Sequence, residues 1–194
     1  ASDVYKRQGA LHALVQDHVV QGRVIFPGAG YLEMARVAAA AALCGVYFLQ
    51  PLAVEAANLL IECAVSDGRF EVRSGKADAI ETAQTVHCSG ATAGGNAWQP
   101  IDHASQRASS FAADVGGLFD GFDVSGLQYG PGYRTLVQAW GSTSHAVARL
   151  RARSTHEGTQ VHPADLDDAL CTSGAMASSG RDGETRLPFG VDDA

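Results

Sequence analysis

The sequence predicts an α+β fold made of two similar units. Each half of the chain holds one helix-forming segment and several strand-forming segments, and a stretch rich in Gly, Ser, Gln and Ala separates the halves. An apolar content of 46% over 194 residues is typical of a soluble globular protein with one good core or two small ones. We therefore expect a first unit at residues 9–93, a linker at 94–110 and a second unit at 111–194.

The first unit is expected to contain one helix and three strands. Residues 11–27 cluster Val, Leu, Ile and Phe, which indicates an extended or turn segment. A helix is predicted over 30–43, because this segment ends in a run of alanines and alanine is the best helix former. The strands are predicted at 54–65, 70–73 and 84–92, with a turn at Ser66-Asp67-Gly68.

The second unit repeats this order coarsely. A turn-rich segment at 126–132 precedes a short apolar segment at 133–140 and a strand at 146–152. His162-Pro163 then opens a helix predicted over 164–177, because proline is favoured in the first helical turn. Two blocks with the same content indicate a duplicated α+β unit.

Composition and charge argue against several classes of protein. The net charge is −7 without a Lys/Arg-rich run, which argues against binding to nucleic acid or to an anionic membrane surface. No apolar stretch is long enough to span a bilayer, and residues 1–8 lack the apolar core of a signal peptide. We therefore expect a cytoplasmic protein whose residues 1–8 form a leader outside the fold. The cysteines are too scattered for a zinc site and are expected to be free thiols: Cys44, Cys63, Cys88 and Cys171.

One apolar segment combines a histidine with a Pro-Gly break before the first predicted helix. His18 is a candidate general base, because the unperturbed pKa of histidine lies near neutrality. The break at Pro27 could direct the backbone N–H of Gly28 at a carbonyl oxygen, so Gly28 is a candidate oxyanion donor. A base beside such a donor indicates proton abstraction next to a carbonyl. The alternative is a core histidine, which is the commoner role for a lone histidine in an apolar run.

Three aspartates lie at the start of the second predicted helix. At ~100° per residue, Asp167 shares a face with two leucines and Cys171, whereas Asp165 and Asp168 point away and are expected to be solvated. Desolvation on an apolar face should raise the pKa of Asp167 and favour the protonated form, which suits a general acid. The sequence thus offers one base and one acid, and their spacing alone does not show that they meet.

Three motifs, in this order, resemble those of dehydratase domains in modular polyketide synthases. The matching segments are His18 to Pro27 for H-x-x-x-G-x-x-x-x-P, Gly126 to Tyr133 for G-x-x-Y-G-P-x-F with Tyr at the end, and His162 to Cys171 for H-P-x-x-L-D-x-x-x-Q/H with Cys at the end. Leu187-Pro-Phe189 matches a later motif of these domains. Each motif is moderately specific, and together they span residues 14–192.

The resemblance implies a double hotdog fold, in which each unit wraps a curved antiparallel sheet around a long central helix. It also implies that His18 from the first unit is the base and Asp167 from the second unit is the acid, facing each other across a substrate tunnel. Tyr129 is expected near the aspartate, where it can hydrogen-bond the substrate hydroxyl. The residues expected to shape the backbone around this pair are Gly22, Pro27, Gly130 and Pro131, and His162 is expected to be structural.

The implied reaction is the loss of water from a (3R)-3-hydroxyacyl thioester, which gives an α,β-enoyl thioester. The acyl chain would be carried on the phosphopantetheine arm of an acyl carrier protein, and no metal or diffusible cofactor is implied. Other domains of the same synthase are implied partners, and the family leads us to expect a homodimer.

The chain departs from the family pattern at Cys171 and at its ends. The family usually has Gln or His at the position of Cys171, and a thiol is a weaker hydrogen-bond donor and acceptor, so we expect a less well-oriented Asp167 and a slower enzyme. The family has further strands before His18 and after Phe189, so we expect a double hotdog truncated at both ends.

Two alternatives stay open at the level of sequence. A related domain could isomerise a double bond, close an ether ring or act as an aromatic product-template domain. Isomerase variants tend to lose the aspartate or the proline of these motifs, so the presence of Asp167 and Pro27 favours dehydration, whereas ring-forming cyclases can retain the same pair. A catalytically silent domain with a structural role in the synthase is the second alternative.

Overall fold

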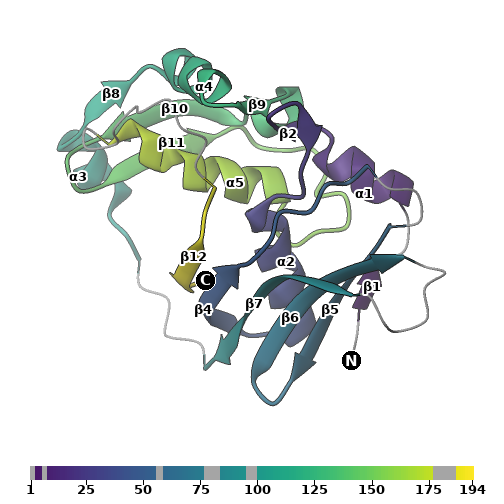
Figure 1. Ribbon diagram of the computed structural model, residues 1–194. Coiled ribbons are helices and arrows are strands. Elements are labelled where there is room, and N and C mark those ends of the chain that lie inside the picture. Colours follow the sequence, from purple (N-terminus) through teal and green to yellow (C-terminus); the bar gives the residue numbers. More distant parts are fainter. Residues whose placement is uncertain (1–2, 6–7, 56–58, 77–83, 95–99, 177–186) are drawn as a thin grey trace.

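The computed structural model describes residues 3–5, 8–55, 59–76, 84–94, 100–176 and 187–194. It combines one large antiparallel sheet, two three-stranded sheets and two central helices, α2 (Gly28–Ala39) and α5 (Pro163–Cys171). Figure 1 shows the large sheet and α2 in the lower part of the molecule. Helix α5 and a three-stranded sheet of the second half lie in the upper part. Within the described residues, no helix combines the length and apolar character that a membrane crossing requires.

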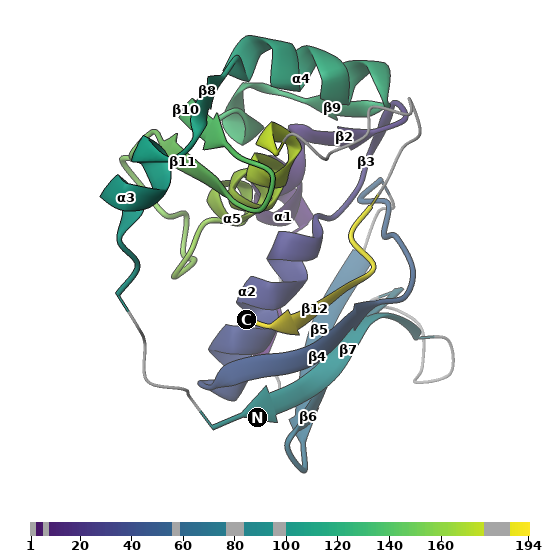
Figure 2. The same ribbon diagram turned by 90° about the vertical axis from the view of Figure 1, so that its left-hand side faces the viewer.

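The large sheet has six strands, and every neighbouring pair in it is antiparallel. Their spatial order is β1 (Asp3–Tyr5), β5 (Leu59–Ser66), β6 (Arg69–Lys76), β7 (Thr85–Ala93), β4 (Ala42–Phe48) and β12 (Gly190–Asp193). Figure 2 shows α2 running along one face of this sheet. The apolar side chains of α2 and of the sheet form the main core, which includes Tyr31, Leu32, Ala35, Leu43, Val46, Ile61, Phe70 and Val72.

The second half has a smaller sheet, in the order β11 (Ala146–Leu150), β10 (Leu136–Gly141) and β8 (Phe111–Ala113). Its helical elements are α3 (His103–Ala108), α4 (Val115–Val124), the 3-10 helix η1 (Pro131–Tyr133), α5, and a second 3-10 helix η2 (Thr172–Ala175). A second core cluster lies here and contains Phe119, Tyr129, Tyr133, Leu136 and Ala164.

A third sheet connects the two halves. It has the order β3 (Arg23–Val24), β2 (His18–Val20) and β9 (Leu127–Tyr129), so strands from both halves pair within it. The turn between β2 and β3 places Gln21 and Gly22 at φ values of 50° and 76°, a left-handed conformation that favours glycine. Helix α1 (Gln8–Val15) precedes β2 in the chain. The pairing of β2 with β9 brings His18 directly opposite Tyr129.

The first central helix ends earlier than the sequence predicts. Ala40 adopts a left-handed conformation, its N–H bonds to the carbonyl of Arg36, and the chain enters β4 at Ala42. Leu43 and Val46 of β4 are buried in the main core. Tertiary pairing of β4 with β7 and β12 therefore outweighs the helix propensity of the alanine run.

Other elements also differ from the expectation. Residues 11–15 belong to α1 rather than to an extended segment, and Leu11, Leu14 and Val15 repeat at the spacing of a helix face. The segment predicted as a linker contains α3, and α4 lies in a segment for which we predicted no element. The strands predicted at 70–73, 84–92 and 146–152 correspond to β6, β7 and β11. The strand predicted at 54–65 corresponds to β5, which begins only at Leu59. Positions 56–58 and 177, which the predictions included, lie outside the described residues.

Strands from both ends of the chain join the large sheet. Strand β1 lies in the segment that was expected to be a leader, and it pairs with β5. This pairing uses backbone hydrogen bonds, which depend little on side-chain type. From the segment assigned to the second unit, β12 returns to pair with β4, as Figure 1 shows. The division of the chain into a first unit that ends at residue 93 and a second unit that begins at residue 111 stays a prediction.

Candidate active site

His18 begins β2 and is almost completely buried. Its Nδ1 lies 2.7 Å from the carbonyl oxygen of Ile25, which can only accept a hydrogen bond. In the neutral imidazole, Nδ1 therefore carries the hydrogen and Nε2 keeps its lone pair. The Nε2 atom lies 3.8 Å from Oδ1 of Asp167, so the potential base points at the potential acid.

Asp167 projects from α5, whose start is set by two local features. The ring of His162 accepts a hydrogen bond from the N–H of Ala164 at the helix N-cap, and Pro163 occupies the first turn. This is the structural role expected for His162. Burial raises the pKa of the Asp167 carboxyl, and the nearby His18 and the hydroxyl of Tyr129 oppose that rise. The environment thus favours the protonated acid more than water does.

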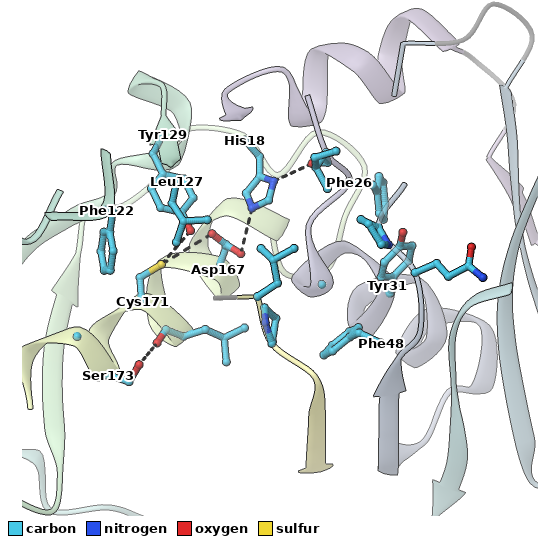
Figure 3. Close-up of a pocket in the computed structure, with 18 of the residues that line it drawn as sticks. His18, Phe26, Tyr31, Phe48, Phe122, Leu127, Tyr129, Asp167, Cys171 and Ser173 are labelled. Atoms are coloured by element: carbon cyan, nitrogen blue, oxygen red, sulfur yellow. Dashed lines mark hydrogen bonds and ion pairs between the residues drawn. The ribbon is translucent and has the colours of Figure 1, made fainter. Parts of the chain in front are cut away.

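Tyr129 and Cys171 complete a small polar cluster around this acid. The hydroxyl of Tyr129 lies 3.3 Å from the sulfur of Cys171, and that sulfur lies 4.0 Å from Oδ2 of Asp167. Burial raises the pKa values of both the phenol and the thiol, so both groups keep their protons. Figure 3 shows His18, Asp167, Tyr129 and Cys171 converging on one another.

These four side chains line a cavity of about 480 Å³. Both halves of the chain contribute to its walls, and most of the lining is apolar. The first half supplies Ile25, Phe26, Gly28, Tyr31, Phe48, Leu49 and Pro51, and the second supplies Phe122, Leu127, Leu170, Leu187 and Pro188. A mostly apolar cavity with a few polar groups in its wall suits a hydrophobic chain that carries one reactive polar group.

Gly28, the candidate oxyanion donor, lies in the wall of the cavity at the first position of α2. The N–H groups of a first helical turn have no partner within the helix and carry partial positive charge. A Cβ at this position would lie 3.2 Å from the ring of Phe48, so glycine allows the helix start to approach that ring closely.

The residues predicted to shape the backbone lie at a helix N-cap, in a turn and in a loop, and none of them is among the residues that line the cavity. Pro27 is fully buried and forms the N-cap of α2. Gly22 forms the β2–β3 turn, and its N–H donates to Oε1 of Gln128 at 2.8 Å. Gly130 and Pro131 lead from β9 into η1, where a side chain on Gly130 would overlap the carboxylate of Asp17.

Comparisons with known proteins agree with this geometry. A model described as the polyketide synthase dehydratase domain matches residues 5–83, and one described as the polyketide synthase dehydratase N-terminal domain matches residues 100–194. The chain belongs to the polyketide synthase dehydratase family. The two matches together cover both halves of the cavity and every candidate site residue.

Among curated members of the family, polyketide synthase ThaG of Burkholderia thailandensis is 34% identical over 175 residues, which are 79% of this chain. Polyketide synthase PksN of Bacillus subtilis is 25% identical over 90% of this chain, and erythronolide synthase EryA2 of Saccharopolyspora erythraea is 26% identical over 89% of it. The chain spans only 3–5% of the length of these three relatives.

Solved structures of polyketide synthase dehydratases share the fold. The dehydratase domain from the CurJ module of curacin polyketide synthase superposes with a TM-score of 0.82, at 21% identity, over 99% of this chain and 72% of that one. A trans-AT polyketide synthase dehydratase domain from Brevibacillus brevis gives a TM-score of 0.79 at 26% identity, over 99% of this chain and 74% of that one. The chain therefore has the double hotdog fold of polyketide synthase dehydratases, as the motifs predict.

The structure corrects the expectation for two aspartates of α5. Asp168 is not solvated: it is 1% exposed, and its Oδ2 accepts hydrogen bonds from both N and Oγ1 of Thr135 at 2.5 Å. Asp165 is also mostly covered and forms an ion pair with Arg153. The helix is covered on more than one side, because η1, β11 and α2 pack around it, so a single apolar stripe does not identify all of its buried residues.

Two aromatic side chains of the cavity, Phe48 and Phe122, were not predicted from the sequence. Phe48 comes from β4, whose residues 44–48 belong to no predicted element, and Phe122 comes from α4, which was not predicted. A signal was present for α4: Leu118, Phe119 and Phe122 have the spacing of a helix face, and Asp114 caps the helix by accepting from the N–H of Gly116.

Proposed function

We propose that this domain eliminates water from a (3R)-3-hydroxyacyl thioester to give an α,β-enoyl thioester. The observation that carries this proposal is the 3.8 Å approach of His18 Nε2 to Asp167 Oδ1 in the wall of a mostly apolar cavity. A base and an acid that face one space can act on neighbouring carbons of one substrate. The reactive carbons would lie beside the pair, within reach of both side chains, and the apolar acyl chain would fill the rest of the cavity.

The proposed reaction divides between the two residues as follows. Neutral His18 removes a proton from the α-carbon through Nε2, whose lone pair is free because Nδ1 donates to Ile25. The electrons of that C–H bond form the new double bond, and the C–O bond at the β-carbon breaks. Asp167 gives its proton to the departing hydroxyl, which leaves as water. His18 then holds one proton and Asp167 lacks one, so a proton must return from His18 to Asp167 before the next turnover.

Two further groups would support this reaction. The developing negative charge on the thioester oxygen would be stabilised by the backbone N–H of Gly28, at the start of α2. The hydroxyl of Tyr129, held beside Cys171 and Asp167, would hydrogen-bond the substrate hydroxyl. A base, an acid and these donors suffice for the elimination, so we propose that no metal or diffusible cofactor takes part.

We also propose that the acyl chain arrives on the phosphopantetheine arm of an acyl carrier protein, within a synthase that supplies the other domains. The relatives support this proposal, because they are polyketide synthases many times longer than this chain. Homodimerisation and a cytoplasmic location stay predictions.

Two of the matched structures support the roles of the pair. They are CurK dehydratase variants, described as inactive mutants, in which a histidine is replaced by phenylalanine and an aspartate by asparagine. That protein thus needs one histidine and one aspartate, which are the residue types that face each other here.

The test is to incubate the folded domain with a 3-hydroxyacyl thioester and to follow the product by mass spectrometry. Wild type should lose one water, and the His18→Ala variant should not. A double-bond isomerase would instead shift an existing double bond, and a cyclase would close a ring on a substrate with a second hydroxyl. If wild type and His18→Ala are equally inactive on all three substrates while both remain folded, the domain is catalytically silent.

A further inference from the structure

Asp17, the residue before His18, binds backbone groups of the second half of the chain through its carboxylate and its backbone carbonyl. One of its oxygens accepts a hydrogen bond from the N–H of Gly132 at 2.6 Å. The backbone carbonyl of Asp17 accepts another from the N–H of Gly130 at 2.7 Å. Hydrogen bonds to a carboxylate are shorter and about twice as strong as those between neutral groups. The residue beside the proposed base is therefore fixed to the loop that follows Tyr129.

The loop is shaped to receive this carboxylate. A Cβ on Gly132 would lie 2.7 Å from Oδ2 of Asp17, and a Cβ on Gly130 would overlap the same carboxyl group. Neither glycine has a positive φ, so backbone conformation alone does not require glycine at these two positions. The space occupied by the Asp17 carboxylate explains why residues 130 and 132 lack side chains.

The same loop is connected to the helix of the proposed acid. A guanidinium nitrogen of Arg153 donates to the carbonyl of Gly132 at 2.7 Å, and Nε of Arg153 donates to Oδ1 of Asp165 at 2.6 Å. Asp165 lies in the first turn of α5, two residues before Asp167. A continuous set of polar contacts thus runs from the neighbour of His18 to the neighbour of Asp167.

A second carboxylate makes an equivalent contact from α2. Glu33 is 4% exposed, and its two oxygens accept hydrogen bonds from the N–H groups of Gln160, at 2.6 Å, and Val161, at 3.3 Å. These residues directly precede His162, the N-cap of α5. The start of α5 is therefore fixed to the helix of the first half whose N-terminus lines the cavity.

We propose that Asp17 and Glu33 are positioning residues that set the separation of His18 and Asp167. Both carboxylates lie in the first half, both bind backbone N–H groups of the second half, and neither lines the cavity. This proposal rests on the proposed dehydration. Its physical basis is that a misplacement of about 1 Å between reacting groups can lower a rate by about 100-fold.

The first test compares Asp17→Ala with Asp17→Asn in the dehydration assay. Asp17→Ala should lower kcat by about 10- to 100-fold with little change in KM, because the cavity walls remain while the pair is displaced. Asp17→Asn should recover most of the loss, because its amide oxygen can still accept from Gly132. Glu33→Ala and Glu33→Gln should behave as a second pair of the same kind.

Asp102→Ala is the matched control. Asp102 also accepts hydrogen bonds from backbone N–H groups, but as the N-cap of α3 it binds Ala104 and Ser105 of its own helix. Its loss should lower stability and leave kcat unchanged. Gly132→Ala serves as a second probe if Asp17→Ala does not fold. It keeps the Asp17 carboxylate and the N–H of residue 132, but its added methyl group displaces that carboxylate, so it should lower kcat as Asp17→Ala does.

Two outcomes would overturn the proposal: folded Asp17→Ala or Gly132→Ala with the kcat of wild type, or Asp17→Asn as impaired as Asp17→Ala. A structural readout separates this failure from failure of the proposed function. Crystal structures of wild type, Asp17→Ala and Asp17→Asn give the distance from His18 Nε2 to Asp167 Oδ1 whether or not the domain is active. That distance should increase in Asp17→Ala alone, and an unchanged distance contradicts the positioning role even if wild type proves inactive.

Discussion

At the scale of single residues, burial dominates the protonation of the proposed site. It raises the pKa values of Asp167, Tyr129 and Cys171, and for each of the three it is the largest influence. Burial thus favours the protonated form of each of these three side chains around the space beside His18. A buried cluster of this kind is suited to donating a proton to a leaving hydroxyl.

The first prediction concerns Cys171, whose sulfur is a weak partner for Asp167 at 4.0 Å. Cys171→Gln should raise kcat by about threefold to tenfold, because an added hydrogen bond contributes about 0.5–1.5 kcal/mol to the orientation of the acid. Steady-state kinetics on a 3-hydroxyacyl thioester measures this, with Cys44→Ser in β4 as a control that should not change turnover. Unchanged or lower activity in a folded Cys171→Gln variant would refute the role assigned to the thiol.

The second prediction concerns Tyr133, which stands where the family motif has Phe. The centroid of its ring lies 5.4 Å from the centroid of the His18 ring. Its buried hydroxyl has no hydrogen-bond partner among the described residues. Tyr133→Phe should raise the free energy of unfolding by about 1 kcal/mol, because it removes an unpaired buried polar group. Urea unfolding tests this against Tyr129→Phe, which removes a partnered hydroxyl and should not stabilise the fold.

The third prediction is a pH dependence of stability that arises from Asp168. Burial raises the pKa of this carboxyl to about 6, although the two hydrogen bonds from Thr135 act in the opposite direction. Between about pH 4 and pH 6 the unfolded chain loses this proton while the folded chain keeps it, so the free energy of unfolding should fall by about 1–3 kcal/mol as pH rises. Asp168→Asn should show a smaller fall in chemical unfolding at several pH values. An identical pH curve for both proteins would contradict the assignment.

At the scale of elements, the predictable parts are those whose pattern is local. Strands β6 and β7 follow from their composition and the turns around them, and the start of α5 follows from His162-Pro163. The α-helix ends at Cys171, earlier than the predicted 177, and η2 follows it. The end of α2 could not be predicted locally, since the alanine run continues past the helix to Ala42, which begins β4, and Leu43 of β4 is buried in the core.

The same distinction applies to the site. His18 and Asp167 could be named because each belongs to a motif of fixed spacing, and the fold then brings the motifs together. The burial of Asp168 could not be predicted, because it depends on Thr135, which is 33 residues away in the chain. The contact between Asp17 and Gly132 spans 115 residues and was likewise outside the reach of local pattern.

The fourth prediction tests how closely β10 packs on η2. A Cβ on Gly141, in β10, would overlap the backbone carbonyl of Ala175. Gly141→Ala should therefore lower the free energy of unfolding by about 1–3 kcal/mol or more, because backbone cannot move aside cheaply. Gly121→Ala in α4 is the control: nothing lies within 4 Å of its Cβ, and it should stabilise the helix by about 0.5–1 kcal/mol. Equal stability of the two variants in urea would contradict the packing described.

At the scale of the whole molecule, the double hotdog places its proposed base and acid in different halves. The halves meet through the β2–β9 pairing, through the contacts of Asp17 and Glu33, and through β12, which returns to the large sheet. The cavity takes its walls from both halves. Chemistry at this site therefore depends on the assembly of the whole chain rather than on either half alone.

The most direct test of this account is a double-mutant cycle on the pair. The rate of water loss from a 3-hydroxyacyl thioester is measured for wild type, His18→Ala, Asp167→Asn and the double variant, with folding of each checked by circular dichroism. Residues that act together on one substrate have non-additive effects, so each single variant should lose nearly all activity and the double variant should be no worse than the weaker single one. Wild-type rates in either folded single variant, or losses that multiply in the double variant, would contradict a base and an acid acting as one pair.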